Sequence, residues 1–218
     1  MNTKEKIIKK ATQEFNKKGF NAISLFELAQ KMEMSRGNLT YHFKDKEVLL
    51  EAISNEMWGK IEKERSKSRQ LPSFENLHNE VQLYYKFQKE YGFIFLDNHV
   101  LNHPLIKKQF QEITKQTIKD NQAAIAFSIQ IGNMRPEPAP GIYYNLALTV
   151  WMMTFYWLSQ KSVRGKNKKE DGEKLIWSLL IPHMTEKGIA SFKKFFGEKY
   201  FETLGPPFDF NIQSYISF

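Results

Sequence analysis

The chain has 218 residues, 41% of them hydrophobic and 14% aromatic, so it can form a sizeable core and disorder of the whole chain is not expected. It contains no cysteine, which excludes disulfides, thiolate zinc sites and cysteine nucleophiles. The net charge is +8, and residues 1–50 hold 10 Lys and Arg against 6 Asp and Glu, which favours a polyanionic partner for this part of the chain.

The first predicted helix begins at Asn2 or Thr3 and ends near Lys18, where Gly19 is a suitable terminator. Four apolar residues at helical spacing form its buried stripe: Ile7, Ile8, Ala11 and Phe15. The opening residues lack the apolar stretch and the small-residue cleavage site of a signal peptide. We therefore expect a cytoplasmic protein.

The stretch that begins at Ser24 predicts two short helices joined by a tight turn. Ser24 and Glu27 form a capping box that starts the first helix, and Ser35 can cap the second. Leu39 and Phe43 lie four residues apart, so both face inward on the second helix. The outward residues of this helix include no acidic side chain. A short helix with apolar anchors and a non-acidic, hydrogen-bonding face fits the major groove of DNA.

Asp45 is expected to cap a longer helix that leads away from these short ones. A strongly charged run at residues 60–72 follows and closes at Pro72. The chain therefore predicts two domains. Residues 1–50 form a three-helix, helix-turn-helix DNA-binding domain, and residues 51–218 form a larger helical domain.

The rest of the chain predicts helices and loops only. Pro104 marks a break, and three prolines within residues 132–141 mark a loop. One predicted helix begins near Ser73. Four others lie at about 105–131, 142–159, 175–182 and 188–203. No alternating strand pattern occurs, so the predicted fold is all-α.

A set of residues at and after the second short helix follows a known order. These residues are Ser35, Gly37, Leu39, His42 and Phe43, then Lys46 and Glu47. With Leu28-Ala29 and Phe15 before them, they resemble the helix-turn-helix of TetR-family transcriptional repressors, over about residues 5–50. The resemblance implies a DNA-binding domain followed by a helical domain that binds an effector and dimerises.

Three positions depart from the family pattern, and one of them, Met32 in place of a usual alanine, slightly alters the packing between the two short helices. Thr40 stands where the family usually has a tyrosine that contacts DNA, although Tyr41 lies beside it. Glu33 replaces a usual glycine in the turn, so either this residue adopts a positive φ or the turn differs. We expect these departures to change the operator sequence and to leave the motif intact.

The predicted roles in DNA binding follow from side-chain chemistry. Arg36, Asn38 and Thr40 are expected to read base edges, and Gly37 lets the backbone approach closely. Tyr41 and His42 are expected to contact phosphate or sugar. Ser24 and Lys46 begin helices whose N-termini suit a phosphate. The predicted contact set is Ser24, Arg36, Gly37, Asn38, Thr40, Tyr41, His42 and Lys46.

The helix at 142–158 is apolar on nearly every side, yet it is too short and too often interrupted by polar residues for a usual membrane span. A helix apolar all round has partners on two sides. The resemblance implies that helices at about 142–160 and 170–185 pair with their mates as a four-helix dimer interface. The predicted contact stripe is Leu175, Ile176, Leu179 and Leu180; a plain monomer core is the alternative.

An aromatic set predicts an effector pocket in the larger domain. Its candidate residues are Tyr84, Phe95, His99, Trp151, Phe155 and Tyr156. Such a pocket suits a small molecule that is mostly apolar or aromatic. The alternative is that the same aromatic residues fill an ordinary core.

Asp97, His99 and His103 are close enough in sequence to suggest a metal site, but Pro104 disfavours helix at His103. The chain has no glycine-rich phosphate loop and no recognisable catalytic arrangement. We therefore predict neither a metal nor a cofactor, and no enzymatic activity.

The sequence thus predicts a homodimeric, ligand-responsive repressor that binds a palindromic double-stranded DNA operator and has no membrane partner. Two alternatives stay open. One is a constitutive or architectural DNA-binding dimer without ligand control. The other is a metal-dependent helical enzyme.

Overall fold

The computed structural model describes residues 2–67, 71–164 and 170–208. Apart from Phe208, the aromatic tail at 208–218 lies outside the described residues. In chain order the helices are α1 (Thr3–Lys18), α2 (Leu25–Lys31), α3 (Arg36–His42), α4 (Lys46–Lys67), α5 (Phe74–Glu90), α6 (Gly92–Leu96), α7 (Asn98–Leu101), α8 (Pro104–Gln130), α9 (Ile142–Arg164), α10 (Gly172–Leu180), the 3-10 helix η1 (Ile181–His183), α11 (Glu186–Phe196) and α12 (Glu198–Glu202). The all-α prediction is confirmed. The described residues form no strand beyond a single bridge between Met134 and Met184.

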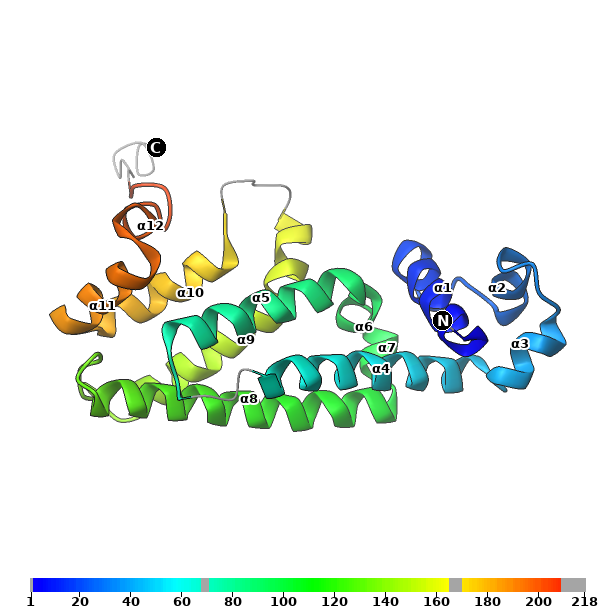
Figure 1. Cartoon of the computed structure of the whole chain (residues 1–218), viewed down its shortest axis with the longest axis horizontal. Coiled ribbons are helices and arrows are strands. Elements are labelled where there is room, and N and C mark those ends of the chain that lie inside the picture. Colours follow the sequence, from blue (N-terminus) through cyan, green and yellow to red (C-terminus); the bar gives the residue numbers. More distant parts are fainter. Residues whose placement is uncertain (1, 68–70, 165–169, 209–218) are drawn as a thin grey trace, which may run out of the picture.

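The molecule is elongated, with a small domain at one end (Figure 1). The small domain consists of α1, α2, α3 and the first turns of α4, and the larger domain lies beyond it. Helix α4 is continuous from Lys46 to Lys67, so it crosses the predicted domain boundary and belongs to both domains. The two domains are therefore joined by a helix and not by a flexible linker.

Caps begin and end the helices of the small domain where the sequence predicts them. Ser24 and Glu27 form both hydrogen bonds of the capping box at α2, and Ser35 accepts a hydrogen bond from the Asn38 N–H at α3. Gly19 ends α1 with a φ of 88°, a conformation that glycine adopts without strain. The side chains that form the core of the small domain are fully buried: Ile7, Ala11, Phe15, Phe20, Ile23, Leu28, Leu39, Phe43, Leu49 and Leu50.

The turn between α2 and α3 contains Glu33 at a φ of 53°. Of the two possibilities that the sequence leaves for this position, the structure has the left-handed backbone. A residue with a Cβ is strained there, at a cost of about 1–3 kcal/mol. The turn therefore keeps the shape that a glycine would give it.

The larger domain is built around α9, which contacts α5, α8 and α10. A buried hydrogen bond of 2.7 Å from Gln88 Nε2 to the Thr154 carbonyl joins α5 to α9. Helix α4 contacts both α5 and α8, so one end of it is part of this domain. None of the described helices is long and apolar enough to cross a membrane.

The C-terminal region differs from the prediction in its last helix. The last predicted helix at 188–203 is two helices, α11 and α12, because Gly197 ends α11 with a φ of 90°. Helix α10 begins at Gly172, where a Cβ would collide with Tyr85 and Trp157. Close packing therefore requires glycine at the start of α10.

Candidate DNA-binding surface, domain junction and interior cavity

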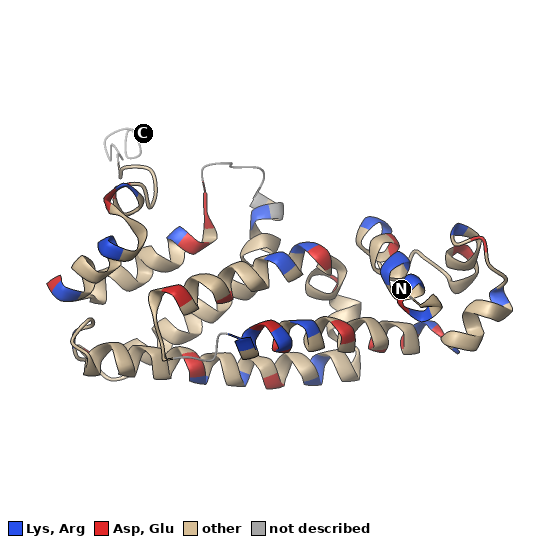
Figure 2. Ribbon diagram, in the orientation of Figure 1, with Lys and Arg blue, Asp and Glu red and all other residues tan. Residues whose placement is uncertain are grey.

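Helix α3 presents a compact polar face at the end of the molecule. Leu39 and Phe43 are 0% and 1% exposed and anchor the helix to the small domain. Arg36 and Asn38 are exposed on the opposite side, and Tyr41 is 85% exposed. Arg36 is the basic residue of α3, which has no acidic residue (Figure 2). This face can donate hydrogen bonds to a nucleic acid without repelling it.

Two further α3 residues are more constrained. The hydroxyl of Thr40 donates within its own helix, to the carbonyls of Arg36 at 3.0 Å and Gly37 at 3.2 Å. Thr40 therefore offers its methyl group and an acceptor oxygen to a partner. The ring of His42 is half-buried and meets the Tyr41 ring edge-on, with 5.3 Å between centroids.

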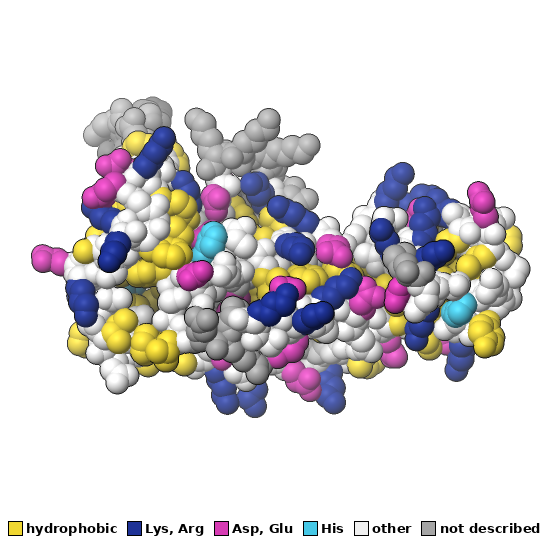
Figure 3. Space-filling model, in the orientation of Figure 1, with side chains coloured by type: hydrophobic (Ala, Val, Ile, Leu, Met, Phe, Trp, Pro, Cys, Tyr) yellow, Lys and Arg dark blue, Asp and Glu magenta, His cyan; other side chains and the backbone are white. Residues whose placement is uncertain are grey.

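The two residues predicted at helix N-termini are already occupied within the protein. Ser24 Oγ donates to Glu27 Oε2 at 2.9 Å. Lys46 Nζ lies over the ring of Phe20, 4.2 Å from its centroid, and burial lowers the pKa of Lys46. Basic side chains lie on the visible face of the small domain (Figure 3), and the exposed lysines of α1 include Lys4, Lys9 and Lys17.

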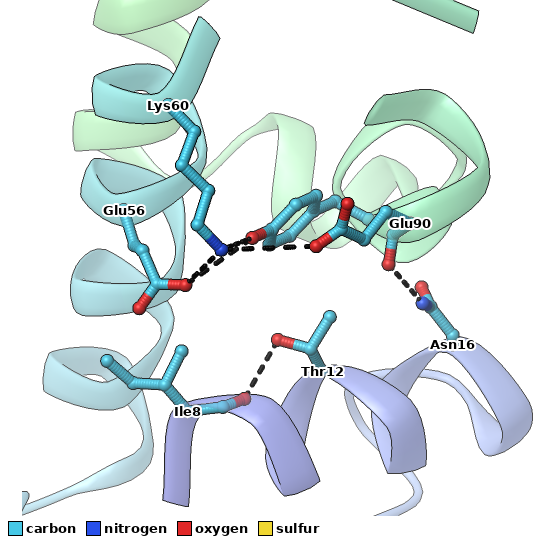
Figure 4. Close-up of polar contacts among 7 residues, drawn as sticks. Ile8, Thr12, Asn16, Glu56, Lys60 and Glu90 are labelled. Atoms are coloured by element: carbon cyan, nitrogen blue, oxygen red, sulfur yellow. Dashed lines mark hydrogen bonds and ion pairs between the residues drawn. The ribbon is translucent and has the colours of Figure 1, made fainter. Parts of the chain in front are cut away.

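The small domain is joined to the larger one by the side chain of Asn16, at the end of α1. Asn16 Nδ2 donates to the Glu90 carbonyl at 2.6 Å, and its Oδ1 accepts from the Phe93 N–H at 3.0 Å. These bonds satisfy backbone groups at the break between α5 and α6 (Figure 4). The ring of Phe93 then packs against Phe15, with 5.3 Å between centroids.

A second polar cluster, centred on Lys60 of α4, lies beside this contact (Figure 4). Lys60 Nζ is 2.6 Å from Glu56 Oε1, 2.8 Å from the Tyr91 hydroxyl and 3.9 Å from Glu90. Burial alone would lower the pKa of Lys60, but the hydrogen bonds to Glu56 and Tyr91 raise it. The junction therefore holds α1, α4 and the α5–α6 break together.

The larger domain contains a cavity of about 1080 Å³ between α4, α5, α8, α9 and α10. Apolar side chains line one part of it: Phe74, Leu77, Leu83, Ile113, Ile125, Val150, Trp177 and Leu180. Six charged side chains that the sequence analysis missed also line it: Glu62, Glu64, Arg65, Lys67, Glu80 and Asp120. One feature of the sequence could have indicated this charged wall. The acidic Glu80 lies on the same predicted helix face as the apolar residues Leu77 and Tyr84.

None of the six aromatic or histidine residues predicted for the effector lines this cavity. Tyr84 packs on Phe155 with 4.4 Å between ring centroids, and Trp151 contacts both Phe155 and Tyr156. Phe95 packs on Phe110, and His99 stacks on Phe20. His99 is exposed, whereas the five aromatic residues pack in the core between helices, because large apolar rings at helical spacing serve packing first. Their contact with an effector stays a prediction.

Most of the predicted dimer stripe packs within the single chain. Ile176 and Leu180 are 0% and 7% exposed within the single chain, so they contact the chain's own core. Leu175 is half-buried and also packs against this core, whereas Leu179 is 37% exposed and faces outward. Exposed apolar side chains on α9 extend the available surface, with Tyr144 at 52% and Met152 at 50%.

The residues considered for a metal are used separately. Asp97 caps α7, where its Oδ1 accepts from the His99 N–H at 2.9 Å. His103 Nε2 lies 3.3 Å from Glu47 Oε2. Among the residues that the structure describes, no three metal-ligating side chains gather at one point.

Comparison with known proteins bears on both domains. Residues 7–53 match the family described as bacterial regulatory proteins of the tetR family, and residues 60–192 match TetR bacterial transcriptional repressors. The HTH-type transcriptional regulator QacR of Staphylococcus aureus is 38% identical over 99 residues, which cover 40% of this chain and 51% of QacR. The chain thus spans about half the length of this curated relative.

Solved structures share the fold over most of the chain. A TetR-family regulator from Marinobacter aquaeolei has a TM-score of 0.79 at 21% identity, over 92% of this chain and 99% of that one. The structure of AibR in complex with isovaleryl coenzyme A and operator DNA has a TM-score of 0.60 at 19% identity, over 83% of this chain and 97% of AibR.

Proposed function

Because this chain belongs to the TetR family of bacterial transcriptional regulators, we propose that it is a ligand-responsive repressor that binds a palindromic operator as a homodimer in the cytoplasm. The observation that carries the proposal is the face of α3. It is exposed, free of acidic residues, held by two fully buried anchors, and directly precedes the 22-residue helix α4. Such a helix can enter the major groove as a fixed unit.

In this proposal Arg36 and Asn38 read base edges, and Thr40 contributes its methyl group or acceptor oxygen. An arginine that forms two hydrogen bonds with guanine supplies about 1–3 kcal/mol of discrimination between bases. Tyr41 and His42 contact phosphate or sugar, together with the N-termini at Ser24 and Lys46. To contribute its charge, Lys46 has to leave the ring of Phe20.

The dimer is proposed to form through the outward faces of α9 and α10. Exposed large apolar residues on these helices favour burial against a second copy: Tyr144, Met152 and Leu179. A two-fold dimer places its two α3 helices on half-sites about 34–36 Å apart, or a multiple of this distance.

Ligand control is supported by the cavity, which has the volume of a small-molecule site. Helix α4 contributes both to the cavity wall, through Arg65, and to the core of the small domain, through Leu49 and Leu50. A ligand that prefers one arrangement of α4 would therefore shift the position of α3. AibR, which shares this fold, has a structure in complex with isovaleryl coenzyme A and operator DNA.

One experiment tests the proposal. DNA bound from a random pool is sequenced, and its affinity is then measured by fluorescence anisotropy with and without metabolite extracts. We expect a palindrome with half-sites one helical turn or a multiple apart, and a ligand effect of about 5–150-fold. Enrichment of no sequence would refute the regulator function. A palindrome without any ligand effect would refute ligand control alone.

A further inference from the structure

The charged part of the cavity wall has an unequal number of positive and negative groups. Arg65 Nη2 is 2.8 Å from Asp120 Oδ2 and 3.3 Å from Glu80 Oε1. One guanidinium thus serves two carboxylates, which come from different helices. Asp120 also accepts a hydrogen bond of 2.8 Å from Gln116 Nε2. The three ionised groups together carry one net negative charge.

Glu80 is the less satisfied of the two carboxylates. A quarter of its side chain is exposed, yet its Oε1 atom is buried and accepts no hydrogen bond. Burial raises the pKa of Glu80, and Arg65 opposes this rise only in part. A buried carboxylate oxygen without a hydrogen bond is costly, so a donor or a cation placed beside it would be stabilising.

Nearby lysines do not supply that cation. Among the described lining residues, the cations are Arg65 and Lys67. Lys67 Nζ is held by Glu64 at 2.8 Å. The charge beside Glu80 and Asp120 is therefore not balanced by a second side chain of the described wall.

The apolar part of the wall lies close to this charge. Leu77 precedes Glu80 by one helical turn on α5, and Phe74 lies one turn further. The ring of Phe74 meets Trp177 edge-on, with 5.8 Å between centroids. A ligand that touches Glu80 can thus place an apolar body against Phe74 and Trp177, whose rings also attract a nearby cation.

We propose that the effector of this protein is an organic cation with an apolar body, whose positive group lies beside Glu80 and Asp120. An anion would meet two carboxylates and compete with them for Arg65. A neutral apolar molecule would leave Glu80 Oε1 with its 3.3 Å contact to Arg65 and no hydrogen bond. A cation gains from both carboxylates. The effector role rests on the proposed function; the charge preference of the cavity does not.

Two ions of matched shape and opposite charge test the preference directly. Tetraphenylphosphonium and tetraphenylborate are titrated into the full chain by calorimetry in sodium buffer. We expect the cation to bind at least tenfold more tightly than the anion. Equal affinities, tighter binding of the anion, or binding of neither ion would each overturn the proposal.

Variants locate the charge that matters. We expect Glu80→Gln to weaken tetraphenylphosphonium about tenfold and to leave any tetraphenylborate binding unchanged or stronger. Asp120→Asn should act in the same direction and serves if Glu80→Gln does not fold, as checked by circular dichroism. Glu112→Gln is the control, because Glu112 lies on α8 as Asp120 does, is exposed and does not line the cavity. An equal loss in Glu112→Gln would overturn the assignment.

The same titration separates this inference from the proposed function. If the phosphonium ion binds through Glu80 but does not change operator affinity, the charge preference stands and ligand control by this cavity fails. If the ion releases the operator, both are supported. If an anion or a neutral extract component releases the operator instead, ligand control stands and the cation proposal is overturned.

Discussion

At the scale of single residues, the proposed DNA-reading face carries little of the fold. Tyr41 is 85% exposed, and its only described ring partner is His42. Arg36 and Asn38 are likewise exposed, whereas the anchors Leu39 and Phe43 are buried. Substitutions on the exposed face should therefore report on DNA binding without a loss of stability.

We expect Tyr41→Phe to weaken operator binding by about 0.5–1.5 kcal/mol, because the hydroxyl would no longer donate to a phosphate. Fluorescence anisotropy with operator and random DNA measures the effect, which should be similar for both. Tyr144→Phe is the matched control, since Tyr144 is an exposed tyrosine on α9 in the larger domain. A loss confined to operator DNA would show that Tyr41 reads bases.

Replacement of Glu33 by glycine is expected to stabilise the protein. Glycine has no penalty at a φ of 53°, so Glu33→Gly should raise the free energy of unfolding by about 0.5–1 kcal/mol, less than the strain because glycine also loosens the unfolded chain. Lys9→Gly, at an exposed position inside α1, should lower it by about 1 kcal/mol. Urea unfolding followed by circular dichroism compares the two, and a destabilised Glu33→Gly would contradict the strain.

Glu14 predicts a pH dependence of stability. Its carboxylate is 3.0 Å from Lys31 and 3.2 Å from Lys10, and these lysines hold the pKa of Glu14 below its ordinary value. A lowered pKa in the folded state stabilises the fold above the unfolded pKa, and this contribution is lost as the pH falls through the folded value. Glu14→Gln should thus be less stable than the wild type at pH 7. The difference should shrink as the pH falls from about 5 towards 3, as thermal unfolding would show.

At the scale of elements, the small domain is attached to the larger one by more than a shared helix. Asn16 of α1 bonds to backbone groups on both sides of the α5–α6 break, and Lys60 of α4 bonds to Tyr91 in the same break. A change in the direction of α5 relative to α6 would therefore move α1 as well as α4. These contacts fix the angle between the domains.

We expect Asn16→Ala to lower the free energy of unfolding of the small domain by about 1–2 kcal/mol, because two hydrogen bonds are lost. It should also weaken the effect of a bound ligand on operator affinity, since the domains would be less firmly coupled. Asn21→Ala, at an exposed position after α1, is the control. Unchanged stability and an unchanged ligand effect would show that the Asn16 bonds are incidental.

Element boundaries were predictable where a local signal decides them. The capping residues Ser24, Ser35 and Asp45 all lie at helix starts in the structure, because an N-cap depends on only a few neighbours. The break at Gly197 was missed, since a glycine inside an apolar repeat does not itself reveal a positive φ. The burial of Ile176 in the chain's own core was also missed, because periodicity identifies an apolar face but not the surface against which it packs.

The candidate sites also differ in whether a local signal decides them. The exposed face of α3 was predictable because one short helix contains both its anchors and its polar residues. The cavity was not, because Arg65, Glu80 and Asp120 come together from α4, α5 and α8, far apart in the chain. Composition pointed to aromatic residues for the cavity, but rings such as Tyr84 and Phe155 pack against each other instead.

At the scale of the whole molecule, the proposed function requires two copies. We expect the chain to sediment as a dimer at micromolar concentration and the double variant Met152→Arg, Leu179→Arg to sediment as a monomer, because buried unpaired charges oppose association. The monomer should bind the operator at least tenfold more weakly. Leu96→Arg is the control, as Leu96 is 55% exposed on α6. A double variant that stays dimeric would place the interface elsewhere.

In the proposed function, helix α4 would also act as a lever arm. A helix rises about 1.5 Å per residue, so Lys46 and Arg65 are about 28 Å apart along its axis. A tilt of about 5° at the cavity end would move the other end by about 2.5 Å, close to the length of a hydrogen bond. In a two-fold dimer the two displacements are opposed by symmetry, so the spacing of the two α3 helices would change by up to twice that amount. A ligand that shifts Arg65 only slightly would thus be enough to misalign both helices with a rigid duplex.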